Sequence, residues 1–564
     1  MDNPMQRHMV VRCSRWLDDT NGGKGMSGDA APNGTREDGR RQKIGGLYSH
    51  YVLAVLVLVY VFNFIDRQIL SILAEDIKAD LGVTDAQIGF LYGTVFAVFY
   101  AVFGIPLARF ADVWVRRSLI SAGLFFWSAM TALSGTARSF SVLALYRIGV
   151  GIGEASASPA AYSMLSDYYA PKRRATVIAI YSSGVYIGAG IGLVLGGWIL
   201  DQWTAMYPVN PPLGLKGWHV AFMVVGLPGL FMAAWVRTLR EPIRGLSEGL
   251  VTKPHPEPLH VLRTEMAAVI PPFNIVAIIR TGASLRFNLI TLSGIALGSA
   301  LLISLTGSVA QWVATGIGVY VTVSWAQSLK SRDPATFAMI FGSKAMIYTM
   351  LAFPTIAFVG YGVGFWTAPL LMRAHGATAT EVGIWLGLGA AAGGFLGVTI
   401  GGIAADWLKT KFPSGRLVLG YVAIVGTVPA VLVLIYTESL YFAFWINFVA
   451  TLVGACWPGV PPSTANDLVM PRMRAVAGAY YILVNTFIGL ALGPYVIGQI
   501  SDVFMANGFE SAEALRNAMA CSMLIFVVSI FCLIQAQRHL PRDESSRLDR
   551  ARAMGESLDE SGSN

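Results

Sequence analysis

The sequence has few charged residues and few cysteines for its length. Only 13% of its 564 residues are charged, whereas a soluble domain carries about 25%. Three of its four cysteines, Cys456, Cys521 and Cys532, lie in or near apolar segments, and only Cys13 lies in a polar one, so no disulfide framework is expected. The seven histidines do not cluster with metal-ligand spacing, and no Walker A pattern occurs. We therefore expect no metal, no cofactor and no ATPase activity within this chain.

The sequence is rich in long apolar runs, which indicate an all-α polytopic membrane protein. Hydrophobic residues make up 54% of the chain, and a membrane-spanning helix needs about 20 mostly apolar residues. The net charge of +8 does not indicate a nucleic-acid partner, because the lysines and arginines lie in short loops between the runs. Twelve spans are predicted, at 51–73, 87–108, 118–136, 141–164, 175–200, 218–237, 346–372, 382–405, 416–436, 440–463, 475–499 and 515–536.

The distribution of positive charge predicts the orientation of these spans. Four loops on one side, between spans 2–3, 4–5, 8–9 and 10–11, hold eleven lysines and arginines, and the opposite loops hold five. Cytoplasmic loops carry the excess of positive charge. We therefore expect both termini on the cytoplasmic side of a plasma membrane, or of the inner membrane if the source is bacterial.

The rest of the chain divides into two tails and an insert. Residues 1–46 and 538–564 are polar and are predicted to be disordered cytoplasmic tails; Met26 is an alternative start to Met1. They flank two six-helix bundles, 47–240 and 346–537. The linker between them, 241–345, contains an apolar run at 289–326 that is long enough for two spans turning near 306–308. Basic flanks on both sides favour twelve plus two spans; a re-entrant or interfacial hairpin is the alternative.

The two bundles contain an internal repeat. One block recurs at an offset of 300 residues and a second block, rich in glycine, recurs at an offset of 301. The matched pairs are Asp167/Asp467, Pro171/Pro471, Arg174/Arg474 and Ala175/Ala475, then Gly188/Gly489, Gly192/Gly493, Gly197/Gly498 and Asp201/Asp502. Two homologous halves with the same topology are typical of the major facilitator fold, in which substrate binds between the halves and their rocking alternates access.

Charged residues inside two spans are the main candidate site. The stretch NFIDRQIL in span 1 holds Asp66 and Arg67, and span 4 holds Arg147 and Glu154 on one helical face. Ionisable residues within a membrane are costly and usually functional. Span boundaries place Asp66 and Arg147 at similar depths, roughly 10 and 9 Å from the outer end, so we expect them to pair. Proton coupling and a static ion pair are both compatible with this arrangement. Arg67 is expected to point outward rather than to form a second pair.

Two further patterns have structural and functional interpretations. The loop after span 2 resembles the major facilitator loop signature, with Asp112, Arg116 and Arg117 retained, and Asp406 occupies the matching place in the second half. These residues predict a cytoplasmic charge latch between the bundles, in which Asp112 and Asp406 act at a helix end or with an arginine and which breaks on inward opening; the alternative is loop charge that only sets topology. Span 5 carries glycines every four residues from Gly184, which predicts close helix packing and gives only a weak indication of export.

NFIDRQIL in span 1, RIGVGIGEA in span 4 and the end of span 7 resemble the Spinster branch of the major facilitator superfamily. The resemblance implies a secondary transporter, proton-coupled in bacterial members, for lysophospholipid-like or sphingolipid-like substrates. It also implies that Asp66, Arg147 and Glu154 act in the cavity. We expect a monomer that acts on protons and on a small-molecule or lipid-like substrate within the bilayer. Candidates to line the cavity are Asn63, Arg67, Tyr92, Phe96, Ser158, Tyr181, Tyr361, Trp366 and Trp457.

Other functions remain open on the sequence alone. An organic-anion or sugar-acid symporter would use Arg147 to bind a carboxylate. A passive lipid facilitator would not need carboxylates linked to pH, and a transporter-like sensor would usually carry a folded cytoplasmic domain. An enzyme is not expected, because the sequence contains no nucleophile–base pattern. Substrate does not follow from fold.

Overall fold

The computed structural model describes residues 44–248, 255–280 and 282–555, and their regular secondary structure is helical. The N-terminal half contains α2 (Leu47–Leu81), α3 (Asp85–Tyr92), α4 (Thr94–Val113), α5 (Arg116–Ser134), α6 (Phe140–Glu154), α7 (Ala157–Tyr168), α8 (Arg174–Ser182), α9 (Gly184–Met206) and α10 (Gly217–Arg237). The insert contains α11 (Pro258–Val269), α12 (Phe273–Arg280), α13 (Leu285–Thr306), α14 (Val309–Arg332) and α15 (Pro334–Phe341). The C-terminal half contains α16 (Lys344–His375), α17 (Ala379–Lys411), α18 (Val418–Tyr436), α19 (Leu440–Gly454), α20 (Val460–Leu468), α21 (Arg474–Asn485), the π-helix η8 (Thr486–Leu492), α22 (Gly493–Ala506), α23 (Ser511–Ser522), α24 (Phe526–Ser545) and α25 (Arg547–Ala553).

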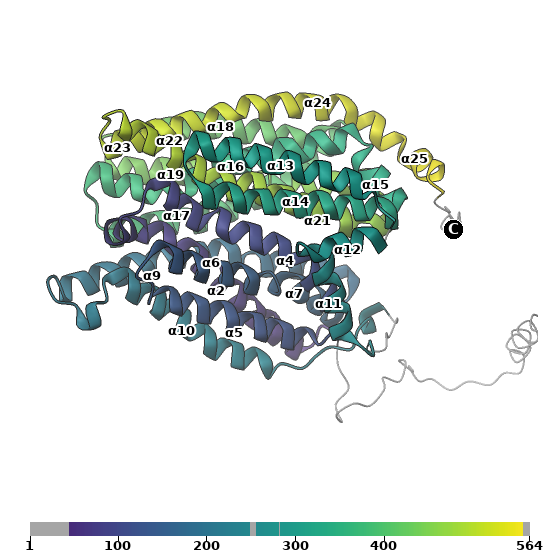
Figure 1. The fold of residues 1–564 in the computed structure, drawn as a ribbon, viewed down its shortest axis with the longest axis horizontal. Helices are drawn as coiled ribbons and strands as arrows, with labels where there is room; N and C mark the ends of the chain where they lie inside the picture. Colours follow the sequence, from purple (N-terminus) through teal and green to yellow (C-terminus); the bar gives the residue numbers. More distant parts are fainter. Residues whose placement is uncertain (1–43, 249–254, 281, 556–564) are drawn as a thin grey trace, which may run out of the picture. The chain divides into compact units, whose positions relative to one another are not determined.

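The long helices lie side by side, and their connections gather at two ends (Figure 1). One end carries α25 and the linker helices α11 and α12, and the opposite end carries α23 and the α9–α10 connection. The sequence repeat is visible locally, because a 3₁₀ turn at Pro171–Arg173 precedes α8 and an equivalent turn at Pro471–Met473 precedes α21. The predicted all-helical fold of two six-helix halves is confirmed.

Ten helical stretches within the described ranges are long and apolar enough to cross a membrane. Four more helical segments, α5, α6–α7, α14 and α19–α20, are shorter, more polar or broken by a turn. Each lies at the place in the chain where the sequence predicts one of the remaining four of the twelve plus two spans.

Breaks in four spans occur at or near the candidate site. Span 2 breaks at Gly93 and span 5 at Ser183, and span 4 breaks directly after Glu154. Span 11 contains the seven-residue π-helix η8. The Thr94 hydroxyl donates to the Ala491 carbonyl at 2.7 Å, so the break in span 2 lies against the π-helix of the other half. Backbone irregularities of this kind are frequent at functional sites.

The predicted hairpin in the insert is confirmed. Helices α13 and α14 are joined at Gly307 and Ser308, and Gly307 adopts φ 70°, a left-handed conformation that suits glycine. Helix α14 packs against α4 of the N-terminal half and against η8 of the C-terminal half, whereas α13 is mostly exposed. The Asn288 amide joins the two helices, because it donates to Ser324 Oγ and Gln327 Oε1 at 3.1 Å and accepts from the Tyr320 hydroxyl at 2.8 Å.

Polar contacts fix both ends of α14 to the C-terminal half. The Ser308 hydroxyl donates to Gln499 Oε1 at 3.2 Å, and Arg472 pairs with Asp333 at 2.8 Å. The hydrogen bond from Arg472 lowers the pKa of Asp333 to about 2. A lowered carboxyl pKa means that this link stabilises the fold fully above about pH 4 and is lost only as the pH falls toward 2. The contacts of α14 with α4 are apolar, and Val98, Val102 and Val321 lie in one buried cluster.

The prediction of a disordered tail from residue 538 is wrong for residues 538–545 and 547–553, which are helical in α24 and α25. The charged tail binds polar groups of the C-terminal half: Glu544 pairs with Lys409 at 2.6 Å, and Asp543 accepts from the Ser343 hydroxyl and the Ala345 N–H. The predicted N-terminal tail, apart from residues 44–46, and residues 556–564 lie outside the described residues.

Candidate functional site

Helices α2 and α6 bring four charged side chains together inside the N-terminal half. Arg67 Nε donates to Glu154 Oε2 at 2.7 Å, and the Glu154 side chain is completely buried. Arg147 is completely buried and donates from Nη1 to the main-chain carbonyl of Asp66 at 3.3 Å. The predicted depth match between the Asp66 and Arg147 regions is thus present in the structure.

The pairing within this cluster differs from the prediction. Arg147 bonds the backbone of Asp66, not its carboxylate, and no ion pair joins these two side chains in the described residues. The expected outward orientation of Arg67 is wrong, since its guanidinium pairs with Glu154. The physical reason is that neighbouring helical residues point about 100° apart. Asp66 and Arg67 therefore face different parts of the interior.

Aromatic rings surround the Arg67 guanidinium. Its central carbon lies 4.4 Å from the Phe96 ring centroid and 4.9 Å from those of Phe64 and Tyr100. The Phe96 ring is also 5.9 Å from the Arg147 guanidinium. Cation–π contacts of this kind compensate a buried positive charge without a second carboxylate, so the candidate Phe96 lies between the two arginines.

Several polar atoms of the cluster have no hydrogen-bond partner among the described residues. They are Asn63 Oδ1, Asp66 Oδ1, Arg147 Nε and Nη2, Glu154 Oε1 and the Tyr181 hydroxyl. Buried polar groups are normally satisfied, and exceptions call for an explanation. The free Nε–Nη2 edge of Arg147 has the geometry that binds a carboxylate or a phosphate with two hydrogen bonds.

The second half contributes Tyr361 to this region. Tyr361 lies in the middle of α16, close enough to Arg67 for electrostatic interaction. More than a third of its surface is accessible, at 38%.

The other cavity candidates vary in their environment. Tyr92 packs on Phe365 with ring centroids 4.3 Å apart, which brings α3 against α16, and Ser158 is partly buried in α7. Two candidates have packing roles instead. Trp366 is completely buried and donates to the Pro494 carbonyl at 2.8 Å, and Trp457 stacks on Phe353 within the C-terminal half.

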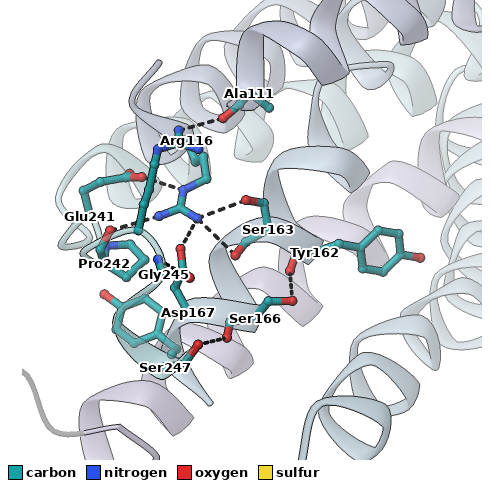
Figure 2. Close-up of polar contacts among 12 residues, drawn as sticks. Ala111, Arg116, Tyr162, Ser163, Ser166, Asp167, Glu241, Pro242, Gly245 and Ser247 are labelled. Carbon is teal, nitrogen blue, oxygen red and sulfur yellow. Dashed lines mark hydrogen bonds and ion pairs between the residues drawn. The ribbon is translucent and has the colours of Figure 1, made fainter. Parts of the chain in front are cut away.

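The predicted latch residue Arg116 belongs to a network inside the N-terminal half (Figure 2). Its buried guanidinium pairs with Asp167 at 2.5 Å and Glu241 at 2.7 Å, and it donates to the Ser163 and Pro242 carbonyls. This network connects α5, α7 and the segment after α10. It does not reach the other half, so in this conformation Arg116 does not form the predicted latch.

The other latch residues also stay within their own halves. Arg117 donates to the carbonyl of Leu239 and from its N–H to Glu241, and exposed Asp112 pairs only weakly with Arg109, at 3.6 Å. Asp406 pairs with Arg416 at 3.1 Å. These residues form no latch between the bundles in this conformation, and the latch stays a prediction for a conformation that is closed at the end that carries them. The loop motif gives the residue types but does not give their partners.

Within the described residues, the ion pairs that join the halves lie at the opposite end, and sequence reasoning missed them. Asp85, at the start of α3, is completely buried and accepts two hydrogen bonds from Arg373 of α16, at 2.7 and 2.9 Å. Asp85 also accepts from the Ser501 hydroxyl of α22 at 2.7 Å. Glu75 pairs with Arg373, and Lys78 pairs with Asp85.

Two aspartates that occupy equivalent positions in the internal repeat, Asp201 and Asp502, also join the two halves at the end that carries Asp85 and Arg373. Asp502, at the end of span 11, accepts from the N–H groups of Asp85 and Ala86 at 3.0 and 2.9 Å. Asp201, at the end of span 5, accepts from the N–H of Thr380 at 2.6 Å. Each carboxylate thus caps the first turn of a helix in the other half. The repeat of Asp201 and Asp502 was the signal that could have revealed them.

Metal binding has no support in the described residues, since no group of three or more His, Cys, Asp or Glu side chains is placed to hold an ion. The chemistry that the arrangement can perform is charge exchange among buried arginines and carboxylates, together with the breaking and forming of contacts between the halves.

Comparisons with known proteins agree with the fold. The model of the Major Facilitator Superfamily matches residues 56–494. An MFS-type efflux pump of Mycolicibacterium smegmatis is 26% identical over 515 residues, which cover 91% of this chain and 98% of that protein. The sphingosine-1-phosphate transporter SPNS2 of Xenopus tropicalis is 23% identical over 84% of this chain and 78% of its own length.

A solved structure is also similar. It is a bacterial homologue of the human lysosomal transporter Spinster, in an inward-facing and unoccupied conformation. It matches with a TM-score of 0.67 at 28% identity and covers 88% of this chain and 98% of its own.

Proposed function

Because the chain belongs to the Major Facilitator Superfamily, we propose that it is a proton-coupled secondary transporter for an amphiphilic or anionic organic solute. One observation carries this proposal: the buried side chains of Asp66, Arg147 and Glu154 and the partly buried Arg67 lie together between α2 and α6. Such groups are expensive within a membrane unless they serve a function. We place the protein in a plasma or inner membrane, with both termini cytoplasmic.

Competition for Arg67 provides the coupling. Glu154 holds Arg67 in this conformation. A proton on Glu154 weakens this ion pair and frees the guanidinium for an anion; conversely, an anion on Arg67 leaves Glu154 without a partner, and a buried carboxylate without a partner is neutralised. Proton and anion binding are therefore linked, and each increases the affinity of the other.

Access alternates through the contacts between the halves. The structure is closed at the end that carries Asp85 and Arg373, and the similar Spinster homologue is inward-facing. Opening this end requires that the ion pairs of Arg373 and the caps by Asp201 and Asp502 break together. In our proposal this is the end that faces away from the cytoplasm.

The substrate class follows from the groups around the arginines. The free edge of Arg147 suits a carboxylate or phosphate, and Phe96, Tyr100 and Tyr361 offer aromatic surface nearby. An anionic headgroup with an apolar tail fits both features. A lipid-like substrate is also the class named for the SPNS2 relative.

A small organic acid, such as a sugar acid, is the second candidate. The same Nε–Nη2 edge of Arg147 favours it, because a small carboxylate needs no apolar wall. Lipid-like and sugar-acid substrates are distinguished by which of them the protein transports.

The test uses proteoliposomes with an internal pH-sensitive dye and an imposed pH gradient. Lysophospholipids, sphingoid phosphates and organic acids are added in turn to the wild type, Asp66→Asn and Glu154→Gln. We expect a substrate-dependent proton flux in the wild type that falls at least about 10-fold in either variant, because each variant removes a titrating group. The active compound identifies the substrate class.

Glu438→Gln is the matched control, since Glu438 is an exposed loop residue, and it should retain full flux. Transport that ignores the pH gradient and survives both buried substitutions would contradict proton coupling. It would favour a passive lipid facilitator, with the buried charges serving only the fold. Binding without any transport would favour a sensor.

A further inference from the structure

A cavity lies beneath the tip of the hairpin, apart from the candidate transport site. It has a volume of about 350 Å³ and is bordered by α3, the α13–α14 turn and α22, which belong to the N-terminal half, the insert and the C-terminal half. Cavities upwards of about 300 Å³ are large enough for small ligands. The buried arginines and carboxylates of the candidate transport site do not line it.

Three glutamines from three different elements face this cavity, Gln87 of α3, Gln311 of α14 and Gln499 of α22. Gln311 is 1% exposed, and its Oε1 has no partner among the described residues. Its Nε2 donates to Thr315 at 3.2 Å. A buried amide oxygen without a partner is costly, which indicates that a donor is expected at this position when the cavity is filled.

The other two glutamines present donors. Gln87 Oε1 accepts from the Thr84 N–H at 3.0 Å, and Gln499 Oε1 accepts from the Tyr495 hydroxyl at 3.0 Å. Because their oxygens are used, their amide N–H groups remain for a ligand. The cavity therefore offers at least one acceptor and two donors.

The charge of the lining excludes ionic ligands. The residues that line the cavity include no Lys, Arg or His. Asp502 is the one carboxylate, and both its oxygens already accept main-chain N–H groups of α3. An anion would find no positive partner, and a cation would compete with a satisfied helix cap. Phe90, Phe140 and Tyr495 supply aromatic surface.

We propose that this cavity binds a neutral, hydroxyl-rich group, such as a sugar ring or polyol. Hydroxyls both donate and accept, so they can satisfy the Gln311 oxygen and the N–H groups of Gln87 and Gln499 together. The group comes either from a free sugar or from the headgroup of a neutral glycolipid; the chemistry of recognition is shared.

Binding at this site opposes opening. The cavity walls come from both halves and meet because Asp502 caps α3. Separation of α3 from α22 would divide the lining. A ligand that needs all three walls therefore stabilises the conformation closed at this end, since a ligand shifts a population by its differential affinity. The hairpin thus supplies a regulatory site, and its tip contributes Ser308 and Gln311 to it.

The test measures thermal unfolding of the full chain in nanodiscs of phosphatidylcholine and phosphatidylglycerol, purified without sugar detergents. The probes are glucose, octyl glucoside below its micelle concentration, and octylphosphocholine as the matched amphiphile. A neutral hydroxylated ligand should give a saturable rise in Tm of about 2 °C or more. A rise with glucose assigns a free sugar, and a rise with octyl glucoside alone assigns a lipid headgroup.

Variants locate the effect. Gln311→Leu should abolish the rise, and Ala310→Trp, which fills the cavity from a lining position, should do the same if Gln311→Leu does not fold. Gln327→Leu changes an amide on the same helix about 24 Å away and should keep the rise. No rise with either sugar compound, an equal rise with octylphosphocholine, or a rise that survives both cavity variants would overturn the proposal. The readout needs no transport, so Asp66→Asn should bind as the wild type does.

Discussion

At the scale of single residues, burial decides which charges matter for stability. Arg116 is 1% exposed and has two carboxylate partners, whereas Arg109 in the preceding helix is 61% exposed in its side chain. Arg109 lies near the end of α4, and Arg116 begins α5. Only the buried arginine leaves uncompensated carboxylates behind when it is removed, since exposed ion pairs contribute little.

We therefore predict that Arg116→Met lowers the free energy of unfolding by about 3 kcal/mol, because Asp167 and Glu241 lose a buried partner. Arg109→Met should change it by less than about 0.5 kcal/mol. The measurement is equilibrium unfolding in detergent by denaturant or heat. A stable Arg116→Met protein with an altered balance of conformations would instead support a latch between the halves.

At the scale of helices, the glycines of α9 allow close packing on two faces of the helix. Gly188 and Gly192 face α2 of the same half, where an added Cβ would meet the carbonyls of Val61 and Ile65. Gly190 faces α17 of the other half, and an added Cβ would lie 2.6 Å from the Gly387 carbonyl oxygen. The predicted packing role of the glycine stripe is confirmed, and the contact between the halves is an additional role.

Gly190→Val should push α9 away from α17 and destabilise this conformation by about 1–3 kcal/mol through overpacking. The expected readout is a lower Tm together with loss of cysteine cross-linking between the two helices. The control is Gly298→Val in α13, where an added Cβ meets nothing within 4 Å. If Gly190→Val left both measurements unchanged, the contact between α9 and α17 would not depend on this glycine.

At the scale of the whole molecule, the polar contacts between the halves concentrate at one end. Arg373, Asp85 and Asp502 join helices from both halves there, while the charge networks around Arg116 and Asp406 stay within one half each. The balance between conformations should therefore depend on the first group far more than on the second.

Asp502→Ala removes the cap on α3 and should shift the population toward the state open at this end by roughly 10-fold, from the loss of two charge-assisted hydrogen bonds. Spin labels at exposed Met206 and Glu510 in a cysteine-free background report the distance between the halves. Asp406→Ala should leave the distance distribution unchanged. A shift with Asp406→Ala and none with Asp502→Ala would place the controlling contacts at the other end.

Sequence alone determined the membrane class, the two related halves, the hairpin with its turn, and the depth at which α2 and α6 carry charge. These follow from apolar run length, the repeat at offsets of 300 and 301, and the helical rise per residue. Each is a property of one segment or of a fixed spacing along the chain.

Only the tertiary structure decided the partners. It paired Arg67 with Glu154, directed Arg116 into its own half, and joined Asp85 to Arg373 across 288 positions. It also showed that residues 538–545 and 547–553 are helical. The physical reason is that an ion pair depends on the rotation of each helix about its axis and on which helices adjoin, and neither is encoded in the hydropathy or spacing of a single segment.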